Sequence, residues 1–212
     1  ARKPGRATLA LGVYAVDIAY LVSYGKTDAA LIKYERARKL AAAIGLVSSF
    51  EEGMFERYVT AGANPDTLRK NLTMTAHNID VEMSKGELAR HAVLFVTGEF
   101  IEKMYILTQV IKQFPDDFPE DVRFQLLRHL MIGIVEQEEA LNDLISLLEQ
   151  IRKDDEGEKF MAEMNNLKQI YVEANFKEKI ANWTPQTVRT GEYMERIISQ
   201  VNRLRNDIVA TE

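Results

Sequence analysis

The sequence predicts an all-α protein, a single domain over residues 1–212 in which about eight antiparallel helices pack as a bundle. Three observations lead to this prediction. Apolar residues recur every three or four positions along most of the chain, which is the period of an amphipathic helix. No segment shows a convincing strand-like alternation of apolar and polar residues. Glycine and proline mark short connections, and helices joined by short connections are usually neighbours.

The first predicted helix, residues 7–24, is apolar apart from Thr8, Asp17 and Ser23. A membrane-spanning helix needs about 20 predominantly apolar residues, so this run is borderline in length. A carboxylate at the centre of a span also costs about 2.5–3.5 kcal/mol on insertion scales. A second apolar run, residues 92–111, is interrupted by charged residues in the same way. The two runs therefore predict central helices of a bundle, and no transmembrane segment is expected.

The second predicted helix follows Gly25, which is placed to end the first helix in a left-handed conformation. Thr27 or Asp28 is expected to cap it, and Gly45 to end it. Five residues at helical spacing are expected to face the core: Ala30, Tyr34, Ala37, Ala41 and Ile44.

Capping signals predict the next two helices. Ser48 and Glu51 have the spacing of a capping box, which predicts a third helix from Ser48. Asn64 followed by Pro65 predicts the N-cap and first residue of a fourth helix. A break at residues 84–86 precedes the fifth helix, which is expected to run to about Phe114.

Pro115 and Pro119 enclose a short acidic connection before the sixth helix, which is predicted to run without interruption from 119 to 151, about 50 Å. A more polar seventh helix covers 159–176, and Thr184 with Pro185 opens the last helix. The sixth helix is expected to bury Leu126, Leu127, Leu130, Ile134, Leu141, Ile145 and Leu148. The last helix is expected to bury Met194, Ile197, Val201, Leu204 and Ile208.

Composition excludes several classes of function. The net charge is −5 and basic residues occur in ones and twos, so no nucleic-acid surface is predicted. The absence of cysteine excludes disulfides, thiolate zinc sites and cysteine nucleophiles. His77, His91 and His129 lack the Glu-x-x-His spacing of di-iron bundles, and phosphate-binding glycine loops are missing. We expect no metal, no cofactor and no recognisable catalytic residue.

Carboxylates within apolar helices form one candidate polar site. Tyr14, Asp17 and Tyr20 are spaced by three residues and share a helix face, and a buried tyrosine hydroxyl is expected to donate to Asp17. On the fifth helix, Glu102 and Tyr105 are the candidate members. Two buried carboxylates held close together can share a proton and act as acid and base. The alternative is that both only fix the register of the helices.

Three segments of the chain resemble a known family. LGVYAVDIAYLVSYGKTDAALIKYERARKLAAAIGL, residues 11–46, is similar to the start of exported, often lipid-anchored helical proteins of Bacteroides-like bacteria, which carry a Gly-Val-Tyr-x-x-Asp-x-x-Tyr run. TGEFIEKMYILTQ, residues 97–109, resembles their Gly-Gly-Trp-Ile-Glu-x-Leu-Tyr segment, with Glu99 replacing a glycine and Phe100 replacing the tryptophan. The ending, residues 193–209, also resembles the family's closing helix.

This resemblance implies an all-α bundle in the cell envelope, periplasmic or attached to the outer membrane after loss of an N-terminal signal, with a lipid anchor as one form of attachment. It implies no activity. Tyr14, Asp17 and Tyr20 match the first motif, and Glu102 and Tyr105 match the second.

The most consistent hypothesis is a non-catalytic envelope protein that binds a protein or small-molecule ligand. An enzyme using Asp17 and Glu102 as an acid–base pair is one alternative, and a purely structural bundle is another.

Overall fold

Helices account for most of the chain in the computed structural model, which describes residues 4–50, 53, 64–85, 88–115, 117–151, 155–179 and 192–210. No strand occurs among these residues, so the all-α prediction is confirmed. The chain forms two compact units, residues 1–102 with 211–212 and residues 103–210, and each is described by itself. The prediction of a single domain depends on how these units are placed together and stays a prediction.

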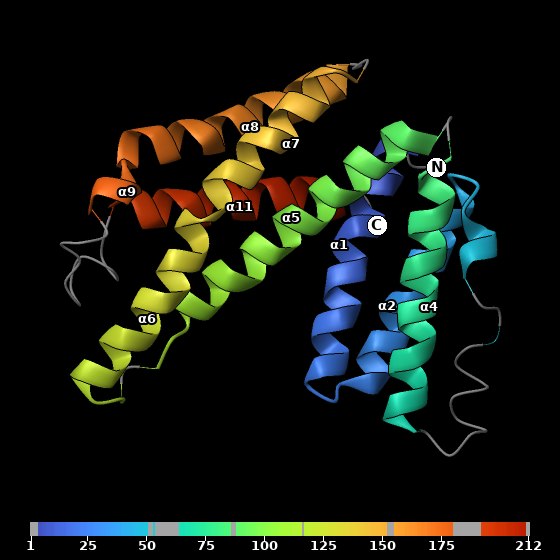
Figure 1. Ribbon diagram of the computed structural model, residues 1–212, viewed down its shortest axis with the longest axis horizontal. Helices are drawn as coiled ribbons and strands as arrows, with labels where there is room; N and C mark the ends of the chain where they lie inside the picture. The colour runs from blue at the N-terminus through green and yellow to red at the C-terminus, as the bar shows by residue number, and fades with distance from the viewer. Residues whose placement is uncertain are drawn as a thin grey trace. The chain divides into compact units, whose positions relative to one another are not determined.

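The first unit is built on a pair of neighbouring helices. α1 packs along α2, and α4 contacts α1 and the short 3-10 helix η1 (Figure 1). Its elements are α1 (Pro4–Ser23), α2 (Thr27–Ala42), η1 (Val47–Ser49), α4 (Pro65–Met83) and the N-terminal part of α5 (Ala89–Lys112). Its largest fully buried side chains are Tyr14, Tyr34, Leu11, Leu46, Leu68 and Ile101. Burying such a side chain stabilises the fold by about 1.5–3 kcal/mol, so packing holds these helices together.

Glycines end α1 and α2 in the same way. Gly25 has φ 67° and Gly45 has φ 78°, a backbone conformation that costs glycine little because it has no Cβ. After α1, the N–H of Gly25 bonds to the Val22 carbonyl and the N–H of Lys26 to the Leu21 carbonyl, the Schellman pattern. Lys26, the residue after Gly25, is already the N-cap of α2, and its side chain makes no capping hydrogen bond. The predicted cap at Thr27 or Asp28 is therefore wrong, because the connection is too short to present one.

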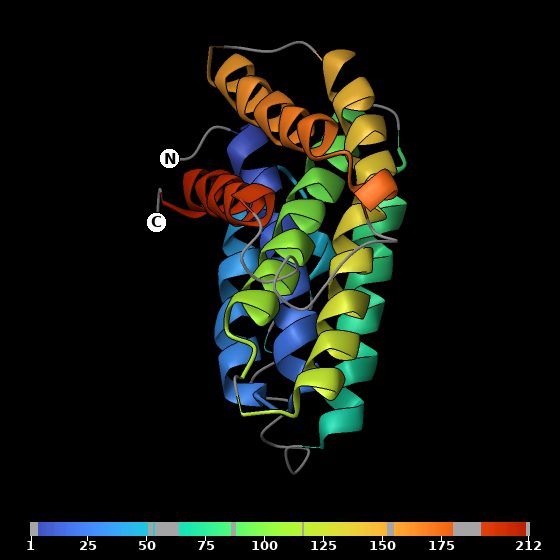
Figure 2. The same cartoon turned by 90° about the vertical axis from the view of Figure 1, so that its left-hand side faces the viewer.

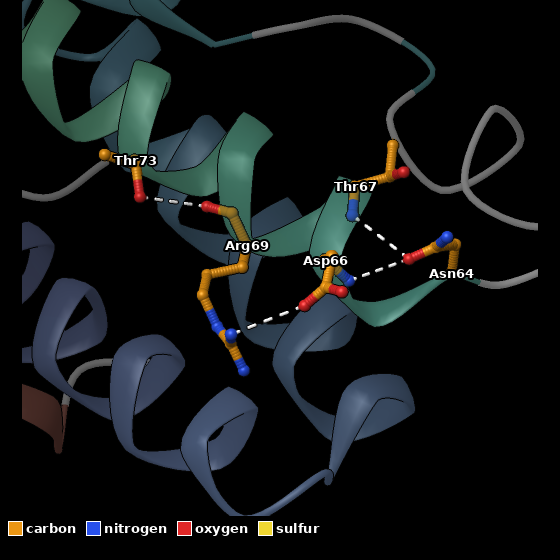
Figure 3. A network of polar contacts seen from close by, with 5 residues as sticks. All are labelled: Asn64, Asp66, Thr67, Arg69 and Thr73. Atoms are coloured by element: carbon orange, nitrogen blue, oxygen red, sulfur yellow. Dashed lines mark hydrogen bonds and ion pairs between the residues drawn. The ribbon is translucent and has the colours of Figure 1, made fainter.

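The cap predicted for α4 is confirmed (Figure 3). Asn64 has an extended backbone, and its Oδ1 accepts hydrogen bonds from the N–H groups of Asp66 at 2.9 Å and Thr67 at 3.4 Å. These bonds satisfy two of the N–H groups that the first helical turn leaves without helix partners. Asp66 also pairs with Arg69 at 3.4 Å, one turn along the exposed face.

Two predicted elements lie largely outside the described residues. Of the helix expected from Ser48 with Glu51, only the turn η1 is described. Thr184 and Pro185, expected to open the last helix, also lie outside the described residues.

α1 and the N-terminal part of α5 cross in the first unit at two glycines. A Cβ added at Gly12 would overlap the carbonyl oxygen of Phe95 and lie 2.9 Å from the backbone nitrogen of Glu99. A Cβ at Gly98 would overlap the carbonyl oxygen of Leu9. The two backbones approach this closely only because both positions lack a side chain. The glycines belong to the two apolar runs of the sequence, residues 7–24 and 92–111, so these two runs meet here.

The second unit packs α8 against both α7 and α11 (Figures 1 and 2). Its elements are the C-terminal part of α5, α6 (Glu120–Val135), α7 (Gln137–Glu149), α8 (Asp155–Ala174), α9 (Phe176–Lys179) and α11 (Glu192–Val209). The stripe predicted for the last helix is confirmed, since its five residues are all buried. The buried Tyr171 hydroxyl donates to the Ile134 carbonyl at 2.8 Å and so links α8 to α6.

The predicted sixth helix is interrupted. α6 and α7 are separated by the single turn residue Glu136, and α7 continues the course of α6 in Figure 1. Most of the predicted stripe is buried, but Leu126 is 44% exposed, and its predicted place in the core is wrong. Leu126 and Leu127 are about 100° apart around the helix, so they cannot both point to the same core.

Candidate functional site

Asp17 lies at the contact of α1 with α2 and forms an ion pair with Lys33. The Lys33 ammonium is 2.8 Å from Asp17 Oδ2 and 4.8 Å from the centre of the Tyr14 ring. The side chains of Lys33 and Asp17 are 29% and 15% exposed, and Tyr14 is buried. An ammonium held between a carboxylate and an aromatic face is stabilised by both. The structure thus joins two of the five candidate residues, around a cation that the sequence analysis did not include.

Tyr20 lies farther along α1 and contacts Tyr24 instead. The two rings are 4.7 Å apart and tilted by 45°, and both side chains are exposed. Loss of hydration raises the pKa of Tyr20, and the neighbouring Tyr24 hydroxyl raises it further. Tyr20 therefore belongs to an exposed aromatic pair at the end of α1.

The two candidates on α5 fall on either side of the boundary between the units. Glu102 is in the first unit and only 1% exposed. Tyr105 is in the second unit, where the Arg205 guanidinium of α11 lies 4.2 Å from its ring centre. This is a favourable cation–π distance, so Tyr105 helps to fix α11 on α5. The acid–base pairing of Asp17 with Glu102 stays a prediction.

Near the glycine crossing, Thr8 of α1 contacts His91 of α5. Thr8 Oγ1 is 2.6 Å from His91 Nδ1 and 2.9 Å from the Pro4 carbonyl oxygen. Partial burial lowers the pKa of His91, and the adjacent Arg90 charge lowers it further. A neutral imidazole is therefore favoured at this contact. Thr8 itself is fully buried, which excludes it as an accessible nucleophile in this structure.

The second unit contains a groove where the end of α5 meets α11. Its volume is about 480 Å³, and it is lined by Ile111, Lys112, Met194, Glu195, Ile198, Ser199 and Asn202. Ile111 and Met194 are buried, whereas Lys112, Glu195 and Ser199 are exposed. The groove therefore combines an apolar base with polar and oppositely charged groups at its edge. Gln109 donates to Asn202 Oδ1 at 3.4 Å and joins the two helices beside it.

A second polar cluster in this unit joins α8 to α11. Gln200 Nε2 donates to the Glu163 carboxylate at 2.7 Å and to the Glu163 carbonyl oxygen at 2.8 Å. The hydrogen bond from Gln200 lowers the pKa of Glu163 most, and the charge of Arg203 lowers it further. This carboxylate stays ionised and fixes the packing of the two helices.

Sequence reasoning missed both Lys33 and the groove. Lys33 stands between an exposed Ile32 and a buried Tyr34, so its local pattern does not distinguish it from a surface lysine. The signal that could have found it is the apolar setting of Asp17, which requires a cationic or donor partner on a neighbouring helix. The groove forms where α5 and α11, which are far apart in the sequence, pack together, and a local sequence pattern does not predict such packing.

Comparisons of the chain with protein-family models, curated protein sequences and solved structures gave no match. Within the described residues, no three histidine or carboxylate side chains are grouped so as to hold a metal ion. α1 is the one described helix that is long and apolar enough to cross a membrane, and 56% of its apolar window is buried within the protein. A core helix and a signal sequence meet the same criterion.

Proposed function

We propose that this protein is a non-catalytic binding module of a bacterial cell envelope. One observation carries the proposal, the groove of about 480 Å³ between α5 and α11. Sites for small ligands commonly have volumes of about 300–1,000 Å³, with an apolar lining and a few polar groups that orient the ligand. The groove has both features, and its position on two packed helices gives it a rigid frame.

The charges at the groove indicate the chemistry of its ligand. Lys112 attracts a carboxylate, Glu195 attracts an ammonium or amide group, and the base formed by Ile111 and Met194 accepts an apolar side chain. The combination favours a small zwitterion with an apolar side chain, such as an amino acid or a short peptide.

Binding can be tested by NMR titration of the protein with apolar amino acids and dipeptides. Chemical-shift changes are expected in α11 around Ser199, and Ser199→Tyr should weaken binding at least about tenfold because the new ring occupies the groove. Ser146→Tyr on the exposed face of α7 is the matched control and should bind like the wild type. Shifts elsewhere, no binding, or equal effects of both variants would contradict the proposal.

The envelope location rests on the resemblance of residues 11–46 and 97–109 to exported helical proteins. Cells that express the complete reading frame should release the protein with the periplasm or retain it in the outer-membrane fraction. The mass of the mature N-terminus should show signal removal, and a lipid anchor would add a diacylglyceryl group. Recovery of unprocessed protein from the cytosol would contradict this location.

An enzyme using Asp17 and Glu102 is the second candidate, favoured by the burial of Glu102. Carboxyl groups shielded from water are common among catalytic acids and bases. The ion pair between Asp17 and Lys33 instead favours a structural role for Asp17. If Asp17→Asn and Glu102→Gln change only thermal stability, and the groove binds nothing, a purely structural bundle becomes the better interpretation.

For the fold, we infer an antiparallel bundle in which α5 and α11 run in opposite directions. Tyr105 contacts Arg205 and Gln109 contacts Asn202, so positions advance along α5 as they go back along α11. The short connection between α1 and α2 supports the same arrangement in the first unit. Distances measured between spin labels placed at the ends of these helices would test the antiparallel arrangement.

A further inference from the structure

The two charged side chains of the groove lie at different levels along α11. Gln109 of α5 donates to Asn202 of α11 at 3.4 Å, and positions go back along α11 as they advance along α5. Three residues farther along α5, Lys112 therefore comes level with Ser199. Glu195 lies four residues before Ser199, and four residues of helix cover about 6 Å along the axis. The cation and the anion are thus offset by about 6 Å along the groove.

Three polar groups at the edge of the groove are available to a ligand. Among the described residues, Lys112 and Glu195 have no ion-pair partner, and the Ser199 hydroxyl makes no hydrogen bond. Asn202, by contrast, is already engaged. Its Nδ2 donates to the Ile198 carbonyl at 2.8 Å, and its Oδ1 accepts the bond from α5. A ligand therefore meets a cation, a hydroxyl and an anion without displacing a described contact of the protein.

The offset determines how long a ligand must be to reach both charges. Lys112 extends from α5 and Glu195 from α11, so each reaches a ligand between the helices from its own side. In a free amino acid both charged groups are bonded to one Cα, which puts the ammonium nitrogen and the carboxylate carbon about 2.5 Å apart. Each further residue in extended form adds about 3.3–3.6 Å. A dipeptide, at about 6 Å, therefore matches the offset, whereas an amino acid is too short and a tripeptide, at about 9–10 Å, is too long.

The base of the groove has one apolar side chain near each charge. Met194 directly precedes Glu195 on α11, and Ile111 directly precedes Lys112 on α5. Both apolar side chains are buried. Each residue of a dipeptide thus has an apolar surface for its own side chain, and removing apolar surface from water favours binding. The base therefore favours apolar side chains at both positions of the dipeptide.

We propose that the groove binds a dipeptide with two apolar side chains in preference to a free amino acid, with the ammonium group at Glu195 and the carboxylate at Lys112. This inference rests on the binding function proposed above and adds the length and direction of the ligand. Ser199, level with Lys112, donates its hydroxyl to the same carboxylate, and a hydrogen bond to a charged group is stronger than one between neutral groups.

Calorimetric titration of the full chain with leucine, dileucine and trileucine tests the length of the ligand. Dileucine should bind at least about tenfold more tightly than leucine, because it meets both charges and both apolar side chains of the base. It should also bind more tightly than trileucine. If leucine or trileucine binds as tightly as dileucine, this inference is overturned while the proposed binding function stands. If none of the three binds, both are overturned.

Capped forms of dileucine test the direction of the ligand. Glu195→Gln should weaken binding of dileucine about two- to fivefold, the effect of an exposed ion pair, and should not change binding of N-acetyl-dileucine, which has no ammonium group. Lys112→Gln should weaken dileucine by a similar factor and should not change binding of dileucine amide, which has no carboxylate. The reversed pattern, or no effect of either variant on dileucine, overturns the proposal.

Lys159→Gln on α8 and Glu149→Gln on α7 are the matched controls, since both residues are exposed and neither lines the groove. They make the same changes of charge and should bind dileucine like the wild type. All four substituted positions are exposed, and circular dichroism verifies that each variant is folded. If the control variants weaken dileucine as much as the groove variants do, only net charge matters and the proposal is overturned.

Discussion

The ion pair between Asp17 and Lys33 is partly shielded from water, so its loss should be measurable. Asp17→Asn leaves the Lys33 ammonium without its charged partner, and we expect the free energy of unfolding to fall by about 1–2 kcal/mol. Lys33→Met should have a similar effect. Because both changes remove the same interaction, the double variant should lose less than the two single variants together.

Urea unfolding of the wild type, the two single variants and the double variant gives the coupling energy directly. We expect it to be about 1 kcal/mol, between the values typical of exposed and of buried pairs. Additive effects would show that the contact between Asp17 and Lys33 contributes nothing to stability.

His91 should make stability depend on pH. The pKa of His91 is lowered in the folded protein by partial burial and then by Arg90, whereas the unfolded chain has a histidine pKa of about 6.5. As pH falls below about 6.5, the unfolded state takes up the proton first, so the folded state loses stability until its own His91 is protonated. Above that pH the contribution is fully present. His91→Gln should flatten this decline.

The measurement is the free energy of unfolding by urea between about pH 7.5 and 5. His129→Gln, at an exposed position on α6, is the matched control and should keep the wild-type decline. An unchanged slope in His91→Gln would show that His91 is not the group responsible.

For individual residues, the sequence predicts whether a side chain is buried better than it predicts which side chain it contacts. The apolar neighbours of Asp17 correctly predict restricted solvent access, and Tyr14 is buried as expected. Its partner, however, comes from α2, and which α2 residue reaches it depends on the register of two helices. Tyr20 shares the helical spacing but lies near the end of α1, where less of the protein covers it.

For the helices, the crossing of α1 and α5 gives a specific prediction about glycine-to-alanine substitutions. Alanine in place of glycine usually stabilises a helix interior by about 0.5–1 kcal/mol. Gly98→Ala should do the reverse and destabilise the protein by about 1–3 kcal/mol or more, because its Cβ would overlap the Leu9 carbonyl oxygen and force the helices apart. Gly12→Ala should behave in the same way against Phe95.

Gly133 on α6 supplies the control for this prediction. A Cβ there would meet only the Leu107 side chain, at an ordinary contact distance of 3.5 Å. Gly133→Ala should therefore keep or raise the melting temperature, while Gly98→Ala lowers it. If Gly98→Ala and Gly133→Ala were both stabilising, this would contradict the close approach of the α1 and α5 backbones.

Helix ends could be predicted where the signal is local. Asn64 with Pro65, Gly25 and Gly45 act as expected, because caps and left-handed turns involve neighbouring residues only. The interruption at Glu136 has no such signal, since neither glycine nor proline stands at Glu136 or directly beside it. The close approach at Gly12 and Gly98 also escaped prediction, because a glycine in an apolar helix shows its purpose only when the facing helix is known.

For the whole molecule, the prediction of a single domain can be tested at α5, the helix that both compact units share. Ala89–Lys112 is one continuous helix, and the boundary between the two compact units falls within it, after Glu102. A helix melts cooperatively over neighbouring turns, so disrupting it at the boundary should affect both units. If residues 1–212 form one domain, the slowest-exchanging amides of α1 and α11 should therefore open with the same free energy.

Lys103→Pro places this disruption at the boundary. Proline removes a helical hydrogen bond and clashes with the preceding turn, so it should cost about 3 kcal/mol or more. Native-state hydrogen exchange should show equal losses of protection in α1 and α11, while Lys103→Ala, which changes the same exposed side chain, should leave both unchanged. A loss confined to one unit would mean that the units unfold independently, because the helix would then transmit no stability from one to the other.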